Sequence, residues 1–346
     1  TGHDFRAYKQ STVLRRIQRR MQITGYETLE GYLPFLRQSA DEGQALLGDL
    51  LIGVTNFFRD EESWASVAHD VIPNIFSDKG RDEVVRVWSI GCSTGEEAYS
   101  MAILMMEHAA TLDEPPGIQV FATDLDENSL AKAREGYYPD SIAADVSAER
   151  LQRFFTKEGS YYRVRREVRD NVLFAAHSVL RDPPFSRLSL VACRNLLIYL
   201  QRTLQDNLFE VFHYALQPGG YLFLGNSETA DSAGDLFQTV DKKHRIYQAR
   251  EWSGQHRALP SLPLISRHQR PVLATRAVER RPPPQDVGVR AMYERTLEEY
   301  GPPTVLVDDE FNVIRLSGTA GRYLRIPDGP PTNNLTRRPA SNPAIS

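Results

Sequence analysis

Between residues 83 and 250, short apolar runs alternate with segments of helical periodicity. Apolar runs such as VVRVWSI and LSLVAC are typical of strands buried on both faces, and their alternation with helices predicts an α/β fold with a parallel sheet between helical layers. The expected strands are VVRVWSI, IQVFATD, LSLVAC, YLFLG after a PGG turn, and HRIYQA. The expected helices between them are Glu96–His108, Asn128–Glu135 and Arg202–Ala215. YYRVRREV and NVLFAAHSV alternate in polarity, which predicts a small antiparallel β-insertion at about residues 140–176.

The first 80 residues show helical patterns only. In Thr12–Met21 the apolar residues recur at three- and four-residue spacing, which predicts one buried helical face. Four arginines stack in pairs beside that face, and residues 1–21 hold six Lys or Arg against one acid. Those arginines are Arg15, Arg16, Arg19 and Arg20. Further helices are expected at Leu29–Leu36, Ala45–Ile52 and Trp64–Phe76.

Proline marks the boundary at the other end, because 13 of the 21 prolines lie in residues 251–346. Residues 251–290 include RRPPPQ and predict an extended linker. Residues 291–326 predict a short helix at TLEEY and two strands, TVLVDD and NVIRLSG, joined by a turn. This segment is too short to bury a core of its own, so we expect a fragment of a domain followed by a disordered tail.

Composition excludes several classes of protein. A formal charge of −4 gives no global attraction to nucleic acid, and two cysteines exclude a disulfide framework and a multi-cysteine zinc site. The eight histidines are scattered without a metal-binding motif, so we expect no metal. No run reaches the roughly 18 apolar residues of a membrane span, and the N-terminal sequence lacks a signal-peptide core. We therefore expect a cytoplasmic protein.

Ligands of open α/β sheets bind beyond the carboxyl ends of the strands, and three such ends carry polar groups here. The first strand end lies within SIGCSTGEEAYS. The strand leads into a tight turn, and Glu96 and Glu97 then begin a helix. Carboxylates at this mouth disfavour a phosphate and suit a cationic or hydroxyl-rich ligand. The second strand ends at Asp124, the position of the acid that binds ribose hydroxyls in nucleoside-binding sheets. The third ends at Arg194 and Asn195.

An alternative interpretation applies to the first of these ends. GCSTG matches G-x-S-x-G, the nucleophile elbow of serine hydrolases, in a strand–turn–helix context. Ser93 would then be the nucleophile, with Asp182 and either His213 or His244 as partners. The roughly 80 helical residues that precede the strand, and the unexplained Asp124, count against this alternative.

Five motifs in one order, VTNFFRD, VWSIGCSTGEEAYS, FATDLD, CRNLLIYL and PGGYLFLGNSE, closely resemble the chemotaxis receptor methyltransferases of the CheR type. The resemblance implies a helical N-terminal domain (1–78) and a seven-stranded, Rossmann-like S-adenosylmethionine-dependent methyltransferase domain (79–250) that carries the β-insertion. It also implies methyl transfer from S-adenosylmethionine to glutamate side chains on cytoplasmic receptor helices, giving methyl esters and S-adenosylhomocysteine.

The resemblance further implies roles for individual residues. Thr55 and Arg59 would lie at the cofactor, with Arg59 near the reacting centre. Glu96 would bind the amino group of the cofactor and Asp124 its ribose. The adenine would be flanked by Ser178, Val179, Arg194 and Asn195. Tyr199 is the second candidate for holding the acceptor carboxylate, and the arginines at positions 15, 16, 19 and 20 would bind the acidic receptor.

The sequence departs from the family pattern at three places. Gly53 stands where some members have Asn, and Ser178 where members have an adenine-flanking Asn. The compact KEGS turn of the insertion does not predict docking on a receptor's C-terminal pentapeptide.

Residues 291–326 resemble the start of a PAS sensor domain. A second hypothesis is a signalling module that binds the cofactor without turnover.

Overall fold

The computed structural model describes residues 5–6, 8–51, 53–77, 79–251, 305–307 and 313–316. Its contacts divide the chain into two compact units, Thr1–His268 and Gln269–Ser346. The second unit is described only by an antiparallel pair, β11 (Val305–Val307) and β12 (Val313–Leu316). This pair confirms the two strands expected there. The predicted TLEEY helix and tail lie outside the described residues, as does the linker apart from Glu251.

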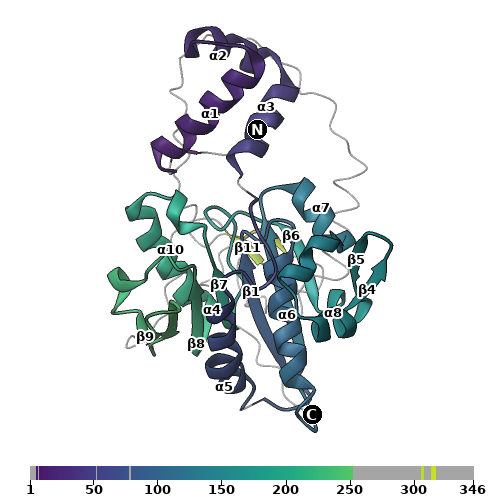
Figure 1. Ribbon diagram of the computed structural model, residues 1–346. Helices are drawn as coiled ribbons and strands as arrows, with labels where there is room; N and C mark the ends of the chain where they lie inside the picture. Colours follow the sequence, from purple (N-terminus) through teal and green to yellow (C-terminus); the bar gives the residue numbers. More distant parts are fainter. Residues whose placement is uncertain are drawn as a thin grey trace, which may run out of the picture. The chain divides into compact units, whose positions relative to one another are not determined.

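The N-terminal part is a bundle of three helices (Figure 1). They are α1 (Gln10–Thr24), α2 (Leu29–Gln38) and α3 (Ala40–Leu50). Thr28 and Ser39 cap the second and third helices, because their hydroxyls accept backbone N–H groups of the first turn. Gly25 ends α1 in the left-handed conformation, with φ of 77°. Three helices were predicted here, and the third begins at Ala40 rather than at Ala45; the connections between the helices are short.

A seven-stranded sheet with the order β6-β2-β1-β7-β8-β10-β9 forms the centre of the following part. Neighbouring strands from β6 to β8 are parallel, and β10 runs antiparallel to both β8 and β9. The strand order reverses at β1, since β2 and β6 lie on one side and β7 on the other. The strands are β1 (Val84–Ile90), β2 (Gly117–Asp124), β6 (Val172–Ala176), β7 (Leu188–Cys193), β8 (Leu216–Leu224), β9 (Phe237–Asp241) and β10 (Ile246–Ala249).

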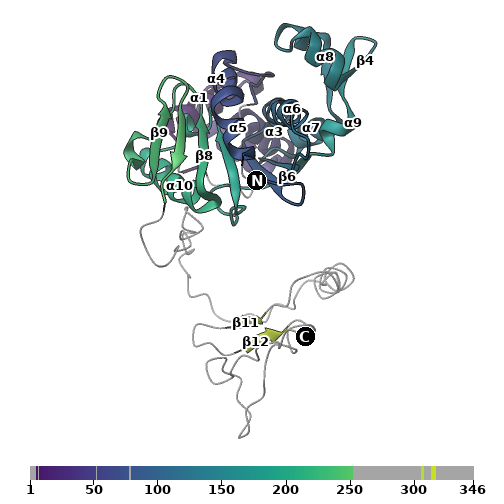
Figure 2. The ribbon, with the colours of Figure 1, turned by 90° about the horizontal axis from the view of Figure 1, so that it is seen from below.

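Two hydrophobic cores cover the two faces of this sheet. Figure 2 shows the helices that lie on either side of it. Val87 packs on one side and its neighbour Trp88 on the other, as alternate side chains of a strand must. The first core is completed by α4 (Glu61–Ser66), a π-helical turn (Val67–Val71), α5 (Ile72–Phe76), α6 (Glu96–Ala109) and α7 (Glu127–Glu135). The second core is completed by α10 (Arg202–Ala215). Strands buried on both faces explain the continuous apolar runs.

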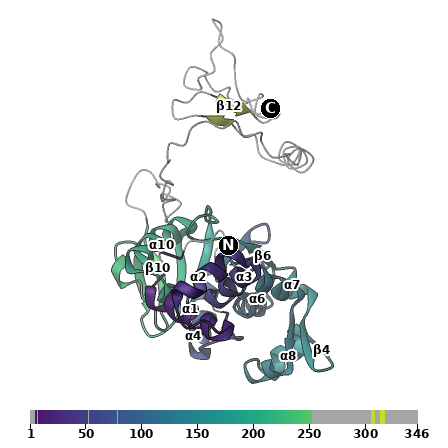
Figure 3. The same ribbon diagram turned by 90° about the horizontal axis from the view of Figure 1, so that it is seen from above.

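A small antiparallel sheet follows α7 and projects to the side (Figure 3). It comprises β3 (Tyr137–Pro139), β5 (Tyr161–Val164) and β4 (Phe155–Glu158), accompanied by the short helices η2 (Asp140–Ala144), α8 (Ala148–Phe154) and α9 (Arg166–Arg169). The ring of Phe57 meets two rings of the insertion edge-on: its centroid lies 4.8 Å from that of Tyr138 and 5.4 Å from that of Phe155. The insertion is therefore anchored to the segment that follows the N-terminal bundle.

Two strand predictions were wrong, and one strand was missed. NVLFAAHSV does not belong to the insertion: β6 pairs in parallel with β2 in the main sheet. Its polarity alternates because β6 is an edge strand with one face exposed to solvent, where Leu173 is 52% exposed. The PGG motif is not a turn before the strand but lies within β8, where the register shifts and Gly219 adopts φ of 74°. Strand β9 was not expected at all.

The segment after the bundle packs on the sheet rather than on the bundle. Trp64, on α4, meets Phe223 of β8 edge-on at 5.4 Å, and Phe57 and Phe58 belong to the same core as Val87. We therefore propose that the boundary between the helical part and the sheet lies near residues 51–53 rather than at residue 78. None of the helices in the described part of the chain combines the length and the apolar composition that a membrane span requires.

Candidate active site

A cavity lies where the carboxyl ends of β1, β2, β6 and β7 converge, next to the reversal of strand order. This is the position at which open α/β sheets bind ligands. Its wall includes six residues predicted from the sequence: Asp124, Ser178, Val179, Arg194, Asn195 and Tyr199. The other predicted residues of the catalytic part, Thr55, Arg59 and Glu96, lie outside this lining.

The turn after β1 brings backbone N–H groups to the cavity. Gly91, Ser93 and Gly95 all have positive φ, and a Cβ on Gly95 would lie 2.9 Å from the Cβ of Ala133. Gly95 is therefore required for the close approach of α6 and α7. The turn directs the N–H of Ser93 to Asp124 Oδ2 at 2.8 Å. The loop at Gly53 also approaches closely, since a Cβ there would lie 2.8 Å from Ser93 Oγ.

Asp124 is fixed at the end of β2 with its carboxylate at the cavity. Oδ2 accepts the N–H of Ser93, and Oδ1 accepts the N–H of Asp126 at 2.9 Å. Burial raises the pKa of Asp124, while these backbone N–H groups oppose the rise. Each carboxylate oxygen has a second lone pair to offer. The group is thus a rigid acceptor suited to the paired hydroxyls of a ribose.

The two glutamates after the turn are oriented differently. Glu96 Oε2 accepts the hydroxyl of Thr94 at 2.7 Å, and burial raises the pKa of Glu96. Glu97 Oε1 accepts the hydroxyl of Ser89 at 2.8 Å; burial raises the pKa of Glu97, and the positive charge of Arg194 opposes the rise. Both carboxylates therefore favour a nearby cation.

Arg194 connects the end of β7 to the TNFFRD segment. Its guanidinium donates to the carbonyl of Arg59 at 2.9 Å and to Asp60 Oδ2 at 2.8 Å, and its side chain is 1% exposed. The same guanidinium lies 4.6 Å from the ring centroid of Phe223. Burial lowers the pKa of Arg194, and the charges of Glu97 and Asp60 oppose this. Arg194 therefore holds the segment that carries Arg59.

The TNFFRD segment itself is tightly constrained. Phe58 and Asp60 both have positive φ, 47° and 62°, which is costly for residues with a side chain. The N–H of Phe58 is bound to Ser100 Oγ at 3.0 Å, and Arg59 Nη1 donates to the carbonyl of Val54 at 3.0 Å. Strain of this kind persists where the surrounding structure enforces it and is concentrated at functional sites.

Three residues of the site were not identified as such from the sequence. Glu228 is 4% exposed and accepts the N–H groups of Gly225 (2.8 Å) and Asn195 (2.9 Å), so it holds the loop that carries Asn195 in its left-handed conformation. His177 and Tyr8 line the cavity. Glu228 stands within the PGGYLFLGNSE motif and Tyr8 opens YKQSTVLRRIQRRM, which also resembles the family, so both had a usable signal.

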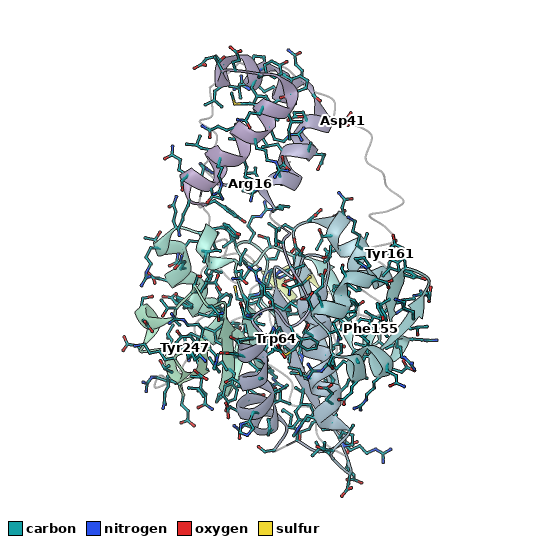
Figure 4. All side chains as sticks on the ribbon, viewed as in Figure 1. Arg16, Asp41, Trp64, Phe155, Tyr161 and Tyr247 are labelled. Atoms are coloured by element: carbon teal, nitrogen blue, oxygen red, sulfur yellow. The ribbon has the colours of Figure 1, made fainter. Side chains whose placement is uncertain are left out.

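The row of arginines on α1 separates into two groups. Arg20 makes a bidentate pair with Glu42 of α3, at 2.9 and 2.6 Å, and Tyr32 donates to the same carboxylate at 2.6 Å. These hydrogen bonds hold the pKa of Glu42 below its ordinary value, against the effect of burial. Arg15 and Arg19 are exposed, and Arg16, labelled in Figure 4, is partly buried. Arg20 thus has a structural partner inside the bundle.

The structure does not support the hydrolase alternative. The hydroxyl of Ser93 is directed to a main-chain carbonyl at 3.4 Å. Asp182 accepts the N–H of Ser178 at 2.7 Å, His244 pairs with Asp241 at 2.7 Å, and His213 binds a main-chain carbonyl at 2.9 Å. The proposed triad partners are therefore engaged elsewhere. The described part of the chain also contains no cluster of three or more ligating side chains that could hold a metal.

Two family models match the chain. The all-alpha domain of CheR methyltransferases matches residues 1–51, and the S-adenosylmethionine-binding domain of CheR methyltransferases matches residues 53–246.

Similar whole proteins agree with these matches. The chain is 37% identical over 334 residues to an uncharacterized 104.1 kDa protein of Rhodobacter capsulatus; this match covers 94% of the chain and 34% of that protein. It is 31% identical to chemotaxis protein methyltransferase 2 of Vibrio cholerae, over 68% of the chain and 84% of that protein. It is 35% identical to the chemotaxis protein methyltransferase of Salmonella typhimurium, over 64% of the chain and 76% of that protein.

Proposed function

Because the chain belongs to the CheR methyltransferase family, we propose that it transfers the methyl group of S-adenosylmethionine to glutamate side chains of chemotaxis-type receptors. The single observation that carries this proposal is the position of Asp124. Its carboxylate is fixed by two backbone N–H groups at the cavity where the strand order reverses, and it retains lone pairs for a ribose diol.

The donor and acceptor groups at the site fit the proposed cofactor. We assign the ribose to Asp124 and the adenine to Ser178, Val179 and the loop at Asn195, which all line the same cavity. The cofactor carries positive charge at sulfur and at its amino group, and the partly buried carboxylate of Glu96 suits the amino group. We also propose that Thr55 and Arg59 lie beside the reacting end of the cofactor.

The proposed reaction needs no general base. A glutamate with an ordinary pKa of about 4.3 is ionised at pH 7, so its carboxylate oxygen is already nucleophilic. The cofactor supplies an electrophilic methyl group: the oxygen–carbon bond forms, the carbon–sulfur bond breaks, and its electron pair remains on sulfur. The protein contributes orientation and exclusion of water. Arg59 and Tyr199 are the proposed groups that hold the acceptor carboxylate.

Receptor recognition is proposed for the exposed part of α1. Arg15 and Arg19 present positive charge to solvent, with Arg16 between them, and steer an acidic helix toward the site. Arg20 contributes less, because Glu42 neutralises it within the bundle.

Two measurements test the proposal. The first is a calorimetric titration of S-adenosylhomocysteine into wild type and Asp124→Ala, in which we expect micromolar-range binding that the substitution abolishes. The second is transfer of labelled methyl groups to receptor membranes, with Arg59→Ala beside wild type. Alkaline release of labelled methanol identifies a glutamyl ester and distinguishes it from alkali-stable N-methylation. Binding without transfer would instead support the non-catalytic signalling module.

A further inference from the structure

We propose that Tyr8, which precedes the helical bundle, is a cofactor-binding residue that contacts the nucleoside across the cavity from Asp124. This inference rests on the proposed function, because it assumes that the cavity holds a nucleoside. It adds an aromatic contact from the N-terminal part of the chain to a cavity whose wall also includes the ends of the sheet strands and the end of α3.

Backbone pairing holds this segment at the catalytic part. Tyr8 forms an isolated antiparallel bridge with Leu200, and the N–H of Lys9 donates to the carbonyl of Tyr199 at 2.8 Å. The side chain of Gln201 donates to the carbonyls of Arg6 (2.9 Å) and Tyr8 (3.4 Å). The partners lie in or directly after the short helix η3 (Leu197–Tyr199), which follows the Arg194–Asn195 strand end. The position of Tyr8 is therefore set by the loop that forms one wall of the cavity.

Tyr8 lines that cavity, and its ring lies beside Phe5 with centroids 5.0 Å apart. It is half-buried and lines the same space as Asp124, Ser178 and Val179. Burial, and secondly the negative charge of Asp124, raises the pKa of Tyr8 to about 12. The phenol therefore stays protonated at neutral pH and can donate a hydrogen bond.

The chemistry of Tyr8 fits a nucleoside better than it fits the methionine end of the cofactor. An aromatic ring offers a stacking surface to a base, and the phenolic hydroxyl offers a donor to a ribose or base acceptor. The lining of the cavity also contains apolar residues, among them Val179 and Leu196. By contrast, Glu96, the carboxylate assigned to the cofactor's amino group, lies outside this lining.

The test is calorimetric titration of S-adenosylhomocysteine into the full chain and its variants. Tyr8→Ala is expected to raise Kd about 5- to 100-fold, in line with the loss of one base–aromatic contact. Tyr8→Phe, which removes only the hydroxyl and keeps the ring, is expected to raise Kd no more than about tenfold. Gln201→Ala, which releases the carbonyl of Tyr8 without touching the cavity, is expected to weaken binding less than Tyr8→Ala. The matched control is Tyr161→Ala, a 52% exposed tyrosine of the insertion labelled in Figure 4.

The outcomes separate this inference from the proposed function. A Kd of Tyr8→Ala within twofold of wild type, with binding abolished in Asp124→Ala, would overturn the role of Tyr8 and leave the cofactor site intact. Absence of binding in folded wild type would overturn the proposed function itself. If Tyr8→Ala does not fold, Tyr8→Leu, which keeps apolar volume but no ring, replaces it with the same expected weakening.

Discussion

Glu228 offers the sharpest test of how the site is held together. Its carboxylate is 4% exposed and accepts three backbone N–H groups: Gly225 at 2.8 Å, Asn195 at 2.9 Å and Ile198 at 3.3 Å. Substitution by Ala leaves all three N–H donors without this acceptor at once. The donors that remain are buried or partly buried, and they belong to the loop next to Arg194 and to the end of β8.

The expected loss of stability follows from these contacts. A hydrogen bond to a charged group contributes about 1.5–3 kcal/mol, so three of them set an upper limit of about 9 kcal/mol. The cost of burying the carboxylate, visible in the raised pKa of Glu228, offsets several kcal/mol of this. We therefore expect Glu228→Ala to lower the free energy of unfolding by about 3 kcal/mol, and the melting midpoint by about 6–12 °C.

Circular dichroism during thermal unfolding measures this effect, with Glu210→Ala as the control because Glu210 is an exposed glutamate of α10. Glu228→Gln keeps one carbonyl acceptor and the side-chain volume, so its midpoint should lie between those of wild type and Glu228→Ala. Titration of S-adenosylhomocysteine into the folded variants should show weaker binding, since Asn195 lines the cavity. A midpoint of Glu228→Ala equal to that of Glu210→Ala would refute the reasoning.

Three further predictions concern neighbouring regions. Gly53→Asn should weaken binding of S-adenosylhomocysteine about fivefold or more, because its Cβ would lie 2.8 Å from Ser93 Oγ and overpacking costs about 1–3 kcal/mol; unchanged affinity by calorimetry would contradict the close approach. Glu42→Gln should destabilise the bundle by about 3 kcal/mol at pH 7 by breaking its pair with Arg20. Because the pKa of Glu42 is lowered in the folded state, this stabilisation is lost as pH falls through that pKa, so urea unfolding curves of wild type and variant should converge in acid. Because the pKa of Asp124 is raised, affinity for S-adenosylhomocysteine should fall as pH falls through that pKa, while Asp124→Asn should show weak binding that does not change over the same pH range. If the affinities of wild type and variant change with pH in parallel, a group other than Asp124 titrates.

Much of the sheet could be predicted because its signals are local. Val84–Ile90 and Leu188–Cys193 were predicted with the bounds that the structure shows, since a continuous apolar run is what a strand buried on both faces requires. Arg202–Ala215 was equally accurate. The edge strand β6 was misassigned because a strand with one exposed face alternates in polarity whether its neighbour is parallel or antiparallel.

The composition of the site was predictable only in part. Asp124 is the last residue of β2 and Asn195 lies two residues after the end of β7, so their places at the cavity follow from the strand assignments. The guanidinium of Arg194 lies against a segment some 135 positions earlier in the chain, and no periodicity encodes that contact.

The sequence by itself determined which segments form helices and strands, the chain order of the motifs that the parallel strands carry, and the family. Each of these depends on residues that are close in the chain, or on motifs whose spacing is shared with relatives. Only the tertiary structure decided that Arg20 pairs with Glu42, that Glu228 holds the Asn195 loop and that Tyr8 reaches the cavity. These contacts join residues 22 positions or more apart, where hydrogen-bond geometry and burial, rather than local propensity, select the partner.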